Sequence, residues 1–252
     1  QGLKLALMTL NTGRLTLPAA CAGTAKRCLQ ISREWSKERK QWGSAIGKHE
    51  AVASKLASMA STTFAMEAMV GLASALADRH TVDIRLEAAM AKLFCSEACW
   101  RIVDDTVQIR GGRGYETADS LRARGEKPFP VERIMRESRI NLIIEGTSDI
   151  MRLFIAREAL DAHLRLVGKA MDPGQPSAVK ARALAKATAY YALWWPRQWA
   201  SLCWTKSYRR FGPLASHLRF VERTSHRLAL ALFHGAVAHQ ARLAYRQQLL
   251  GR

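Results

Sequence analysis

Acidic side chains become rare toward the end of this 252-residue chain. From His163 to Arg252 there are 15 Lys and Arg residues against 2 Asp and Glu, whereas Gln1 to Ala162 carries 24 against 19. The formal net charge of +18 therefore belongs mostly to the last third of the chain. Such an excess favours an acidic partner, which could be anionic lipid, nucleic acid or an acidic surface of the same protein. A solvated basic surface without a partner explains the charge as well.

Cysteine and long apolar runs are also scarce. The five cysteines are odd in number, and no His or second Cys pair near Cys95 and Cys99 completes a zinc pattern. We therefore expect buried thiols, a reducing compartment and no metal site. The longest uncharged runs, such as residues 15–25 and 228–241, are too short for a membrane-spanning helix. Because the chain starts at Gln1 without an initiator Met or a signal-like region, we interpret it as part of a longer protein.

Apolar residues recur at helical spacing over most of the chain. This pattern predicts a first helix over residues 3–39, with a break or kink at Gly13 and Pro18, and further helices over residues 48–80 and 83–109. In the second helix, Phe64, Leu72 and a stripe of Met residues would supply the buried side, with Met as core filler. With a short helix after Glu145, these helices predict an all-α fold built on an antiparallel four-helix bundle. We expect the bundle over residues 1–165, a linker over 166–178 and a helical C-terminal extension over 179–252 that is cut short at its end.

The extension is basic and rich in tryptophan. Trp194, Trp195, Trp199 and Trp204 lie close together in the sequence and are interleaved with Lys and Arg. Indole rings and cations suit a lipid–water interface, but they also suit packing of an extra helical layer onto the bundle. The final helix is expected over residues 214–250.

A lone carboxylate, Glu145, stands between an apolar run and a helix start. We expect residues 141–144 to be extended, Gly146 to allow a tight backbone path, and Thr147 or Ser148 to cap the next helix. The core face of that helix would include Ile150, Leu153 and Phe154. On spacing alone, Glu145 is as well explained as a solvated turn residue.

Four stretches of the sequence resemble, in order and in spacing, the motifs of the acyl-CoA dehydrogenases. Residues 145–148, Glu-Gly-Thr-Ser, are similar to the family's Glu-Gly-Thr-(Ser/Asn) segment, and residues 39–43 are similar to its Arg-x-(Gln/Thr)-Phe-Gly flavin motif. Residues 108–115 resemble its Gln-x-x-Gly-Gly-x-Gly-(Tyr/Phe) motif, and residues 130–145 resemble the helix that leads to the catalytic base. The resemblance covers residues 3–163 and is closest to the long-chain and very-long-chain branch, which also carries a helical extension.

The resemblance implies a role for each matching residue. Glu145 would be the catalytic base, and flavin adenine dinucleotide (FAD) would accept the hydride. The residues expected at the FAD are Arg39, Gln41, Trp42, His49, Gln108, Gly111, Gly112, Thr147 and Asp149. Trp42 replaces the usual Phe, and the loop 116–129 is about ten residues longer than in compact members.

The resemblance also implies contacts with the acyl-CoA substrate. The expected residues are Asn11, Arg14, Gly146 and Arg157, with residues 11–14 forming a turn-like segment. Long-chain members of the family tend to carry Asn at the position of Asn11, where medium-chain members carry Asp, so the resemblance favours longer acyl chains. An ordinary surface ion pair explains Arg14 equally well, and Arg157 could simply pair with Glu158 or Asp161.

These observations predict part of an FAD-dependent enzyme that converts a long-chain acyl-CoA to trans-2-enoyl-CoA in fatty acid β-oxidation. We expect this portion alone to be inactive, and we expect a homodimer or a dimer of dimers that passes electrons to an electron-transferring flavoprotein. The resemblance implies a bacterial cytoplasmic location with membrane association, or the mitochondrial matrix and inner membrane in a eukaryote. Peripheral membrane contact through the extension is favoured over nucleic acid. The alternatives are an acyl-CoA oxidase and a non-catalytic scaffold or membrane-binding module.

Overall fold

The computed structural model describes residues 2–79, 83–239, 242–243 and 246–250, with only the backbone described for residues 2–11. These residues form two compact units, 1–155 and 156–252, and the boundary falls inside one helix, α7. The elements are α1 (Gly2–Glu38), β1 (Lys40–Gln41), β2 (Ser44–Ala45), η1 (Ile46–Lys48), α2 (Glu50–Asp78), α3 (Arg85–Arg110), α4 (Gly112–Tyr115), α5 (Ala118–Ala123), α6 (Val131–Ile140), α7 (Ser148–Met171), α8 (Ser177–Cys203), η2 (Arg209–Leu214), α9 (Ala215–His239) and α10 (Gln247–Leu250).

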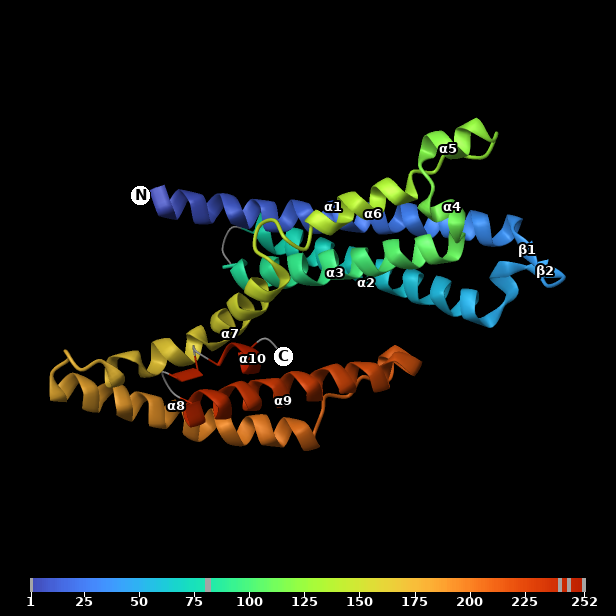
Figure 1. Cartoon of the computed structure of the whole chain (residues 1–252). Helices are drawn as coiled ribbons and strands as arrows, with labels where there is room; N and C mark the ends of the chain where they lie inside the picture. Colours follow the sequence, from blue (N-terminus) through green and yellow to red (C-terminus); the bar gives the residue numbers. More distant parts are fainter. Residues whose placement is uncertain (1, 80–82, 240–241, 244–245, 251–252) are drawn as a thin grey trace. The chain divides into compact units, whose positions relative to one another are not determined.

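The first unit is an up-down-up-down bundle, which confirms the predicted all-α class (Figure 1). Helix α3 packs against α1, α2 and α6. The fourth helix of the bundle is therefore α6. The prediction that the helix after Glu145 takes this place was wrong. Small side chains on α1 and α3 allow close helix packing, because Cys21, Ala25, Cys95 and Ala98 are all fully buried.

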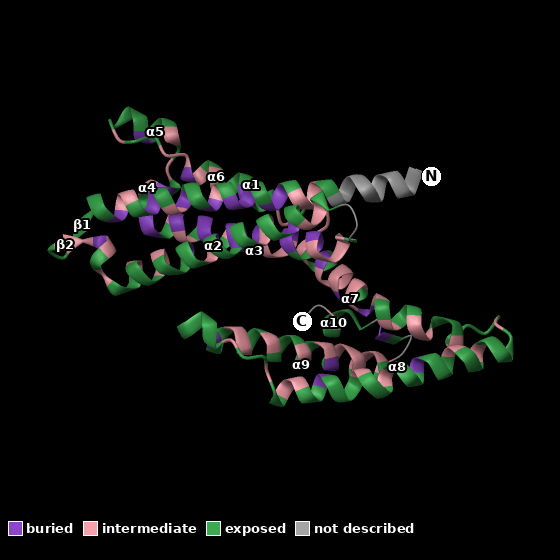
Figure 2. Cartoon of the chain, turned by 180° about the vertical axis from the view of Figure 1, so that it is seen from behind, coloured by how far each residue is buried: buried purple, intermediate pink, exposed green. Residues whose placement is uncertain are grey.

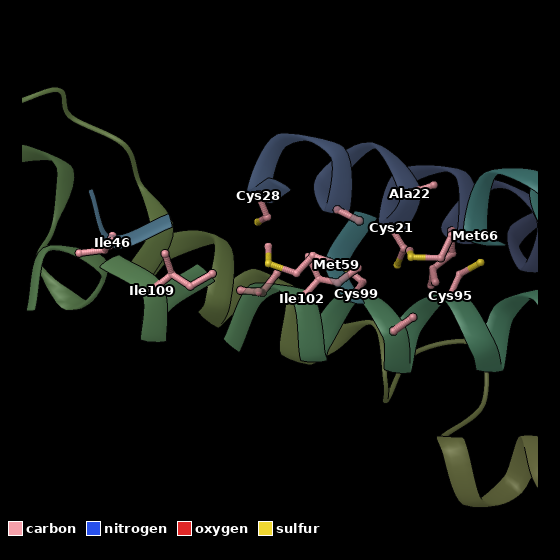
Figure 3. Packing of buried hydrophobic residues seen from close by; sticks show 14 residues of the cluster. Cys21, Ala22, Cys28, Ile46, Met59, Met66, Cys95, Cys99, Ile102 and Ile109 are labelled. Carbon is pink, nitrogen blue, oxygen red and sulfur yellow. The ribbon is translucent and has the colours of Figure 1, made fainter. Parts of the chain in front are cut away.

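Met side chains of α2 complete this core, as Figure 3 shows. Met59 and Met66 are buried between α1 and α3, which confirms their interpretation as core filler. The prediction was wrong for Phe64 and Leu72, which are 74% and 62% exposed. The buried residues of α2 lie on another face of the helix than Phe64 and Leu72. Figure 2 shows that much of α2 remains exposed. By length and composition, α2 is apolar enough to cross a membrane.

Helix α1 is continuous through Gly13 and Pro18, so a break there and the turn expected at residues 11–14 are wrong, whereas a kink stays a prediction. Pro18 removes one intrahelical hydrogen bond, but it is itself fully buried, and packing against the bundle outweighs that loss.

Four of the five cysteines are buried free thiols, as predicted, whereas Cys203 is exposed. Burial raises the pKa of the Cys28 and Cys95 thiols to about 12. These two side chains therefore stay protonated and apolar at neutral pH.

The second unit is built on the packed pair α8 and α9. Of the predicted linker, only residues 172–176 are non-helical, and the Asp172 carboxylate accepts a hydrogen bond from the Gly174 amide at 2.9 Å. The predicted final helix is wrong at its end, since α9 stops at His239 and a separate short helix, α10, follows.

Candidate functional site

The turn between α6 and α7 differs from its prediction. Residues 141–144 are not extended, because their amides continue to bond the carbonyls of the last turn of α6, for example from Ile144 N to Ile140 O at 3.0 Å. The chain then reverses through two residues with positive φ, Glu145 at 56° and Gly146 at 105°. A left-handed conformation is common for glycine but costs free energy at Glu145. The turn therefore holds Glu145 in a strained, defined backbone geometry.

Thr147 caps the helix that follows, as one of the two predicted alternatives. Its Oγ1 accepts a hydrogen bond from the Ile150 amide at 3.3 Å. The predicted core face is wrong at Ile150, which is 57% exposed, and Met151 is fully buried instead. A Cβ on Gly146 would lie 2.7 Å from Met151 Sδ, so this position requires glycine for space as well as for its φ.

The Glu145 carboxylate lies against helix α1. A Cβ built on Gly13 would lie 2.0 Å from Glu145 Oε1, 2.4 Å from Cδ and 2.5 Å from Oε2. Gly13 is therefore not a helix breaker but the position at which α1 leaves room for the carboxylate. Glu145 Oε2 is buried and has no hydrogen-bond partner within the described part of the chain. An acceptor of this kind, half-buried and unpaired, is what a general base would present to a substrate.

Lys92 is a site residue that the sequence analysis missed. It lies in α3, it is fully buried, and its Nζ donates a hydrogen bond to the Gly146 carbonyl at 2.6 Å. Burial lowers the pKa of Lys92 from its ordinary value, while the charges of Glu145 and Glu97 act in the opposite direction. The sequence pattern that could have identified Lys92 is a single Lys among small residues on the buried side of α3, such as Ala88, Ala91 and Cys95.

The predicted substrate contacts are only partly brought together. The Arg14 guanidinium lies over the Phe154 ring, 4.7 Å from its centroid, next to Gly13. The Asn11 side chain lies outside the described residues, and Arg157 lies at an exposed position of the second unit, so neither is placed relative to Glu145. Asp161, one of the predicted partners of Arg157, pairs with Arg165 at 2.5 Å.

The first predicted flavin segment forms a hairpin at the end of the bundle (Figure 1). Trp42 and Gly43 occupy its two-residue turn with φ of 48° and 80°, as a type I′ turn requires. His49 Nε2 lies 3.1 Å from the Gln41 carbonyl oxygen, and the His49 ring meets the Trp42 ring edge-on at 5.5 Å. The hairpin therefore brings Gln41, Trp42 and His49 together and leaves the Trp42 ring 90% exposed.

The second predicted flavin segment lies at the end of α3. Gly111 has a φ of 59° and separates α3 from the one-turn helix α4, so Gly111 and Gly112 make a sharp corner beside Gln108, and all three are exposed. A surface cavity of about 340 Å³ lies nearby, lined by Arg39, Arg110, Arg113 and side chains of the long loop, among them Glu126 and Phe129. Arg113 pairs with Glu126 at 3.0 Å, which ties the long loop back to this corner.

Thr147 and Asp149, the remaining predicted flavin contacts, lie at the start of α7. Thr147 is half-buried, whereas the Asp149 side chain is exposed and lies 3.6 Å from Arg152 Nη1. Arg152 also forms an ion pair with Glu97 of α3. This pair links α7 to the same stretch of α3 that carries Lys92.

The tryptophan-rich segment contains one half-buried ring, that of Trp194, and three exposed rings. Within the second unit, Trp194 packs with His163, Tyr191 and Phe233, and the His163 Nδ1 lies 2.9 Å from the Tyr191 hydroxyl. Burial lowers the pKa of His163. The other three rings, those of Trp195, Trp199 and Trp204, are exposed.

Comparison with known proteins identifies the class to which this bundle belongs. Residues 1–160, more than half of the chain, match the family described as "Acyl-CoA dehydrogenase, C-terminal domain". The chain therefore belongs to this family.

Three similar proteins place the chain more closely. It is 53% identical over its full 252 residues to "Probable acyl-CoA dehydrogenase FadE10" of Mycobacterium tuberculosis, 39% of which it covers. It is 39% identical over 155 residues to the mitochondrial "Very long-chain specific acyl-CoA dehydrogenase" of Bos taurus. This match covers 62% of this chain and 22% of the relative. The structure of an acyl-CoA dehydrogenase complexed with FAD from Bacillus anthracis matches 98% of this chain and 39% of its own chain, with a TM-score of 0.69 and 25% identity. The chain thus spans about two fifths of the length of relatives that match it from end to end.

Proposed function

We propose that the chain is the C-terminal portion of an FAD-dependent acyl-CoA dehydrogenase and that Glu145 is its catalytic base. The observation that carries this proposal is the position of the Glu145 carboxylate, which a strained turn directs against Gly13 with Oε2 buried and unpaired. Abstraction of a weakly acidic α proton from an acyl thioester requires a base of this kind, shielded from water and held in place. Gly146 and Arg14, on either side of the carboxylate, would contact the thioester and the coenzyme A portion.

The residues at the hairpin end of the bundle fit FAD. The Trp42 ring is exposed for stacking, and the cavity beside Arg39 has an excess of positive charge. Arg110 Nε in the wall of that cavity is buried and has no hydrogen-bond partner in the part of the chain that the structure describes. An anionic pyrophosphate would satisfy such groups. When bound, FAD would accept the hydride from the β carbon, since no side chain can do so.

Arg39, Gln41, Trp42 and His49 would hold the dinucleotide from the hairpin. Gln108, Gly111 and Gly112 would bind it from the corner at the end of α3, and Thr147 and Asp149 from the start of α7. The hairpin lies at the exposed end of the bundle, so we propose that Arg39 and Gln41 reach the dinucleotide of a second copy of the chain in a homodimer or a dimer of dimers.

The acyl chain is proposed to be long. The similarity to a very-long-chain relative supports this choice. We propose an electron-transferring flavoprotein as the acceptor, β-oxidation of fatty acids as the process, and Asn11 and Arg157 as further substrate contacts. The basic second unit, with three exposed Trp rings, supports peripheral membrane contact of a bacterial cytoplasmic or mitochondrial matrix enzyme.

The test uses the full-length protein that contains these residues, purified with its flavin. Saturated acyl-CoAs of increasing chain length are added anaerobically while the flavin absorbance is followed in wild type, in Glu145→Gln and in Glu137→Gln. Glu137 is an exposed carboxylate of α6 and serves as the matched control. We expect bleaching in wild type and Glu137→Gln, no bleaching in Glu145→Gln, and the fastest bleaching with long chains.

Each alternative function has its own outcome. In a parallel aerobic assay, rapid oxygen consumption on substrate addition would identify an acyl-CoA oxidase instead of a dehydrogenase. Flavin that binds but is not bleached by any acyl-CoA would overturn the substrate class. A protein that binds no flavin, but binds anionic vesicles with a steep dependence on salt, would be a scaffold or membrane-binding module.

A further inference from the structure

The buried ammonium group of Lys92 requires an explanation beyond helix packing. Lysine is almost never fully buried unless its charge is paired, and burial of an unpaired cation costs several kcal/mol. Lys92 is 0% exposed and is among the largest fully buried side chains of the chain. Its Nζ donates a hydrogen bond to the carbonyl of Gly146, the residue that follows the proposed base.

The turn that receives this hydrogen bond is the strained one. Glu145 and Gly146 both have positive φ, and such a conformation persists only where the surroundings hold it. Two bonds hold this turn: Ser148 N donates to Leu142 O at 3.1 Å, and Lys92 Nζ donates to Gly146 O at 2.6 Å. The second bond fixes the peptide plane next to Glu145 from the interior of the bundle.

The titratable groups around Lys92 come from three elements. Helix α1 contributes the Arg14 guanidinium and the Cys21 thiol, α3 contributes Glu97, and the turn contributes Glu145. Glu97 is already paired with Arg152 of α7. Glu145 Oε2, in contrast, has no hydrogen-bond partner among the residues that the structure describes.

We propose that Lys92 is a positioning residue for Glu145, acting through its hydrogen bond to the Gly146 carbonyl. This inference rests on the proposed role of Glu145 as the base. Lys92 itself touches neither substrate nor flavin. It holds the turn so that the carboxylate faces Gly13 and the acyl-CoA.

The test separates proton abstraction from hydride transfer. The full-length protein with its flavin is incubated in D2O with a 3-thia-acyl-CoA, which has sulfur in place of the β carbon and cannot be oxidised to an enoyl product. Exchange of its α protons for deuterium is followed by mass spectrometry at one fixed pH. The variants are Lys92→Met, Lys92→Arg, Glu145→Gln and, as a matched control, Lys55→Met. Lys55 is a partly exposed Lys of α2 that pairs with Asp105, away from the turn.

We expect Lys92→Met to retain its flavin and its affinity for the thia-acyl-CoA while exchange slows by roughly tenfold to hundredfold, as expected for a base displaced by about 1 Å. Lys92→Arg, which retains hydrogen-bond donors at this position, should restore most of the wild-type exchange rate, and Lys55→Met should exchange at the wild-type rate.

Several results would overturn the inference. Exchange by Lys92→Met within twofold of wild type would show that Lys92 only packs. Equal losses in Lys92→Met and Lys55→Met would point to general destabilisation. If Lys92→Met loses its flavin, Lys92→Arg decides, and exchange in that flavin-bound variant as slow as in Glu145→Gln would refute the positioning role. Exchange that persists in Glu145→Gln would instead overturn the proposed base, and the role of Lys92 with it.

Discussion

Replacement of Gly13 by alanine should separate the stability of the bundle from the position of the proposed base. Gly13 lies inside helix α1, where alanine is favoured over glycine by about 1 kcal/mol. The new methyl group, however, would lie 2.0 Å from Glu145 Oε1, where real Cβ contacts are essentially never closer than 3.0 Å. The carboxylate must therefore move by at least 3.0 − 2.0 = 1.0 Å.

A displacement of this size has a known scale of effect on catalysis. A reacting group misplaced by 1 Å can lose about 10²-fold in rate, which corresponds to about 2.7 kcal/mol in the barrier. We expect Gly13→Ala in the full-length enzyme to slow anaerobic flavin reduction by long-chain acyl-CoA by about that factor. The thermal midpoint of unfolding should stay within a few degrees of wild type. The free energy that alanine contributes through its higher helix propensity offsets the free energy lost at the contact with Glu145.

Gly23 provides the matched control for this experiment. It lies in the same helix, and a Cβ at Gly23 would meet nothing within 4 Å. Gly23→Ala should raise the midpoint slightly and leave the rate of flavin reduction unchanged. Flavin reduction by Gly13→Ala at the wild-type rate would refute the argument that the Gly13 surface sets the position of the carboxylate. If Gly13→Ala, but not Gly23→Ala, loses both its flavin and its fold, the Glu145 carboxylate cannot move aside to accommodate the new methyl group.

Three further predictions concern single contacts. Thr147→Ala removes the cap on the Ile150 amide and should cost about 1 kcal/mol in urea unfolding, whereas Thr147→Ser should cost much less; equal costs would refute the cap. Trp42→Asn suits a type I′ turn, so the hairpin should persist while flavin affinity, measured by fluorescence titration, falls roughly three- to tenfold; unchanged affinity would remove the ring from the flavin site. The lowered pKa of His163 means that the unfolded chain binds the proton first, so the thermal midpoint should fall as pH drops below about 6.5 and level off below the folded-state pKa. His163→Phe should lack this dependence, and a wild-type slope in that variant would contradict the assignment.

The helical elements were predictable because they depend on periodic burial. The spacing of apolar residues found the three long helices of the bundle within a few residues of their observed ends. Periodicity could not tell which large side chains face inward on α2, since this helix is apolar on nearly every side. Phe64 and Leu72 were misplaced for that reason, while Met59 and Met66 were placed correctly.

The turn around Glu145 shows what local sequence rules miss. Residues 141–144 are rich in Ile and Leu, which predicts an extended segment, yet their amides remain bonded to the end of α6. Gly13 likewise satisfies the ordinary signal for a helix break, but the space that it leaves is occupied by a side chain 132 residues further along the chain (145 − 13). Neither contact can be found from neighbouring residues, because each depends on how separate helices pack.

The candidate site is therefore a property of the bundle interior rather than of one motif. The Glu-Gly-Thr-Ser segment supplies the carboxylate and the cap, α1 supplies the surface at Gly13, and α3 supplies the donor at Lys92. A strained turn of this kind is stable only while all three elements are packed. It follows that substitutions loosening the contact of α1 with α3, such as Ala25→Gly in the core, should impair proton abstraction before they unfold the protein, although Ala25 lies eleven residues beyond Arg14 along α1. In this fold, the helix packing that accounts for stability also determines where the base can be.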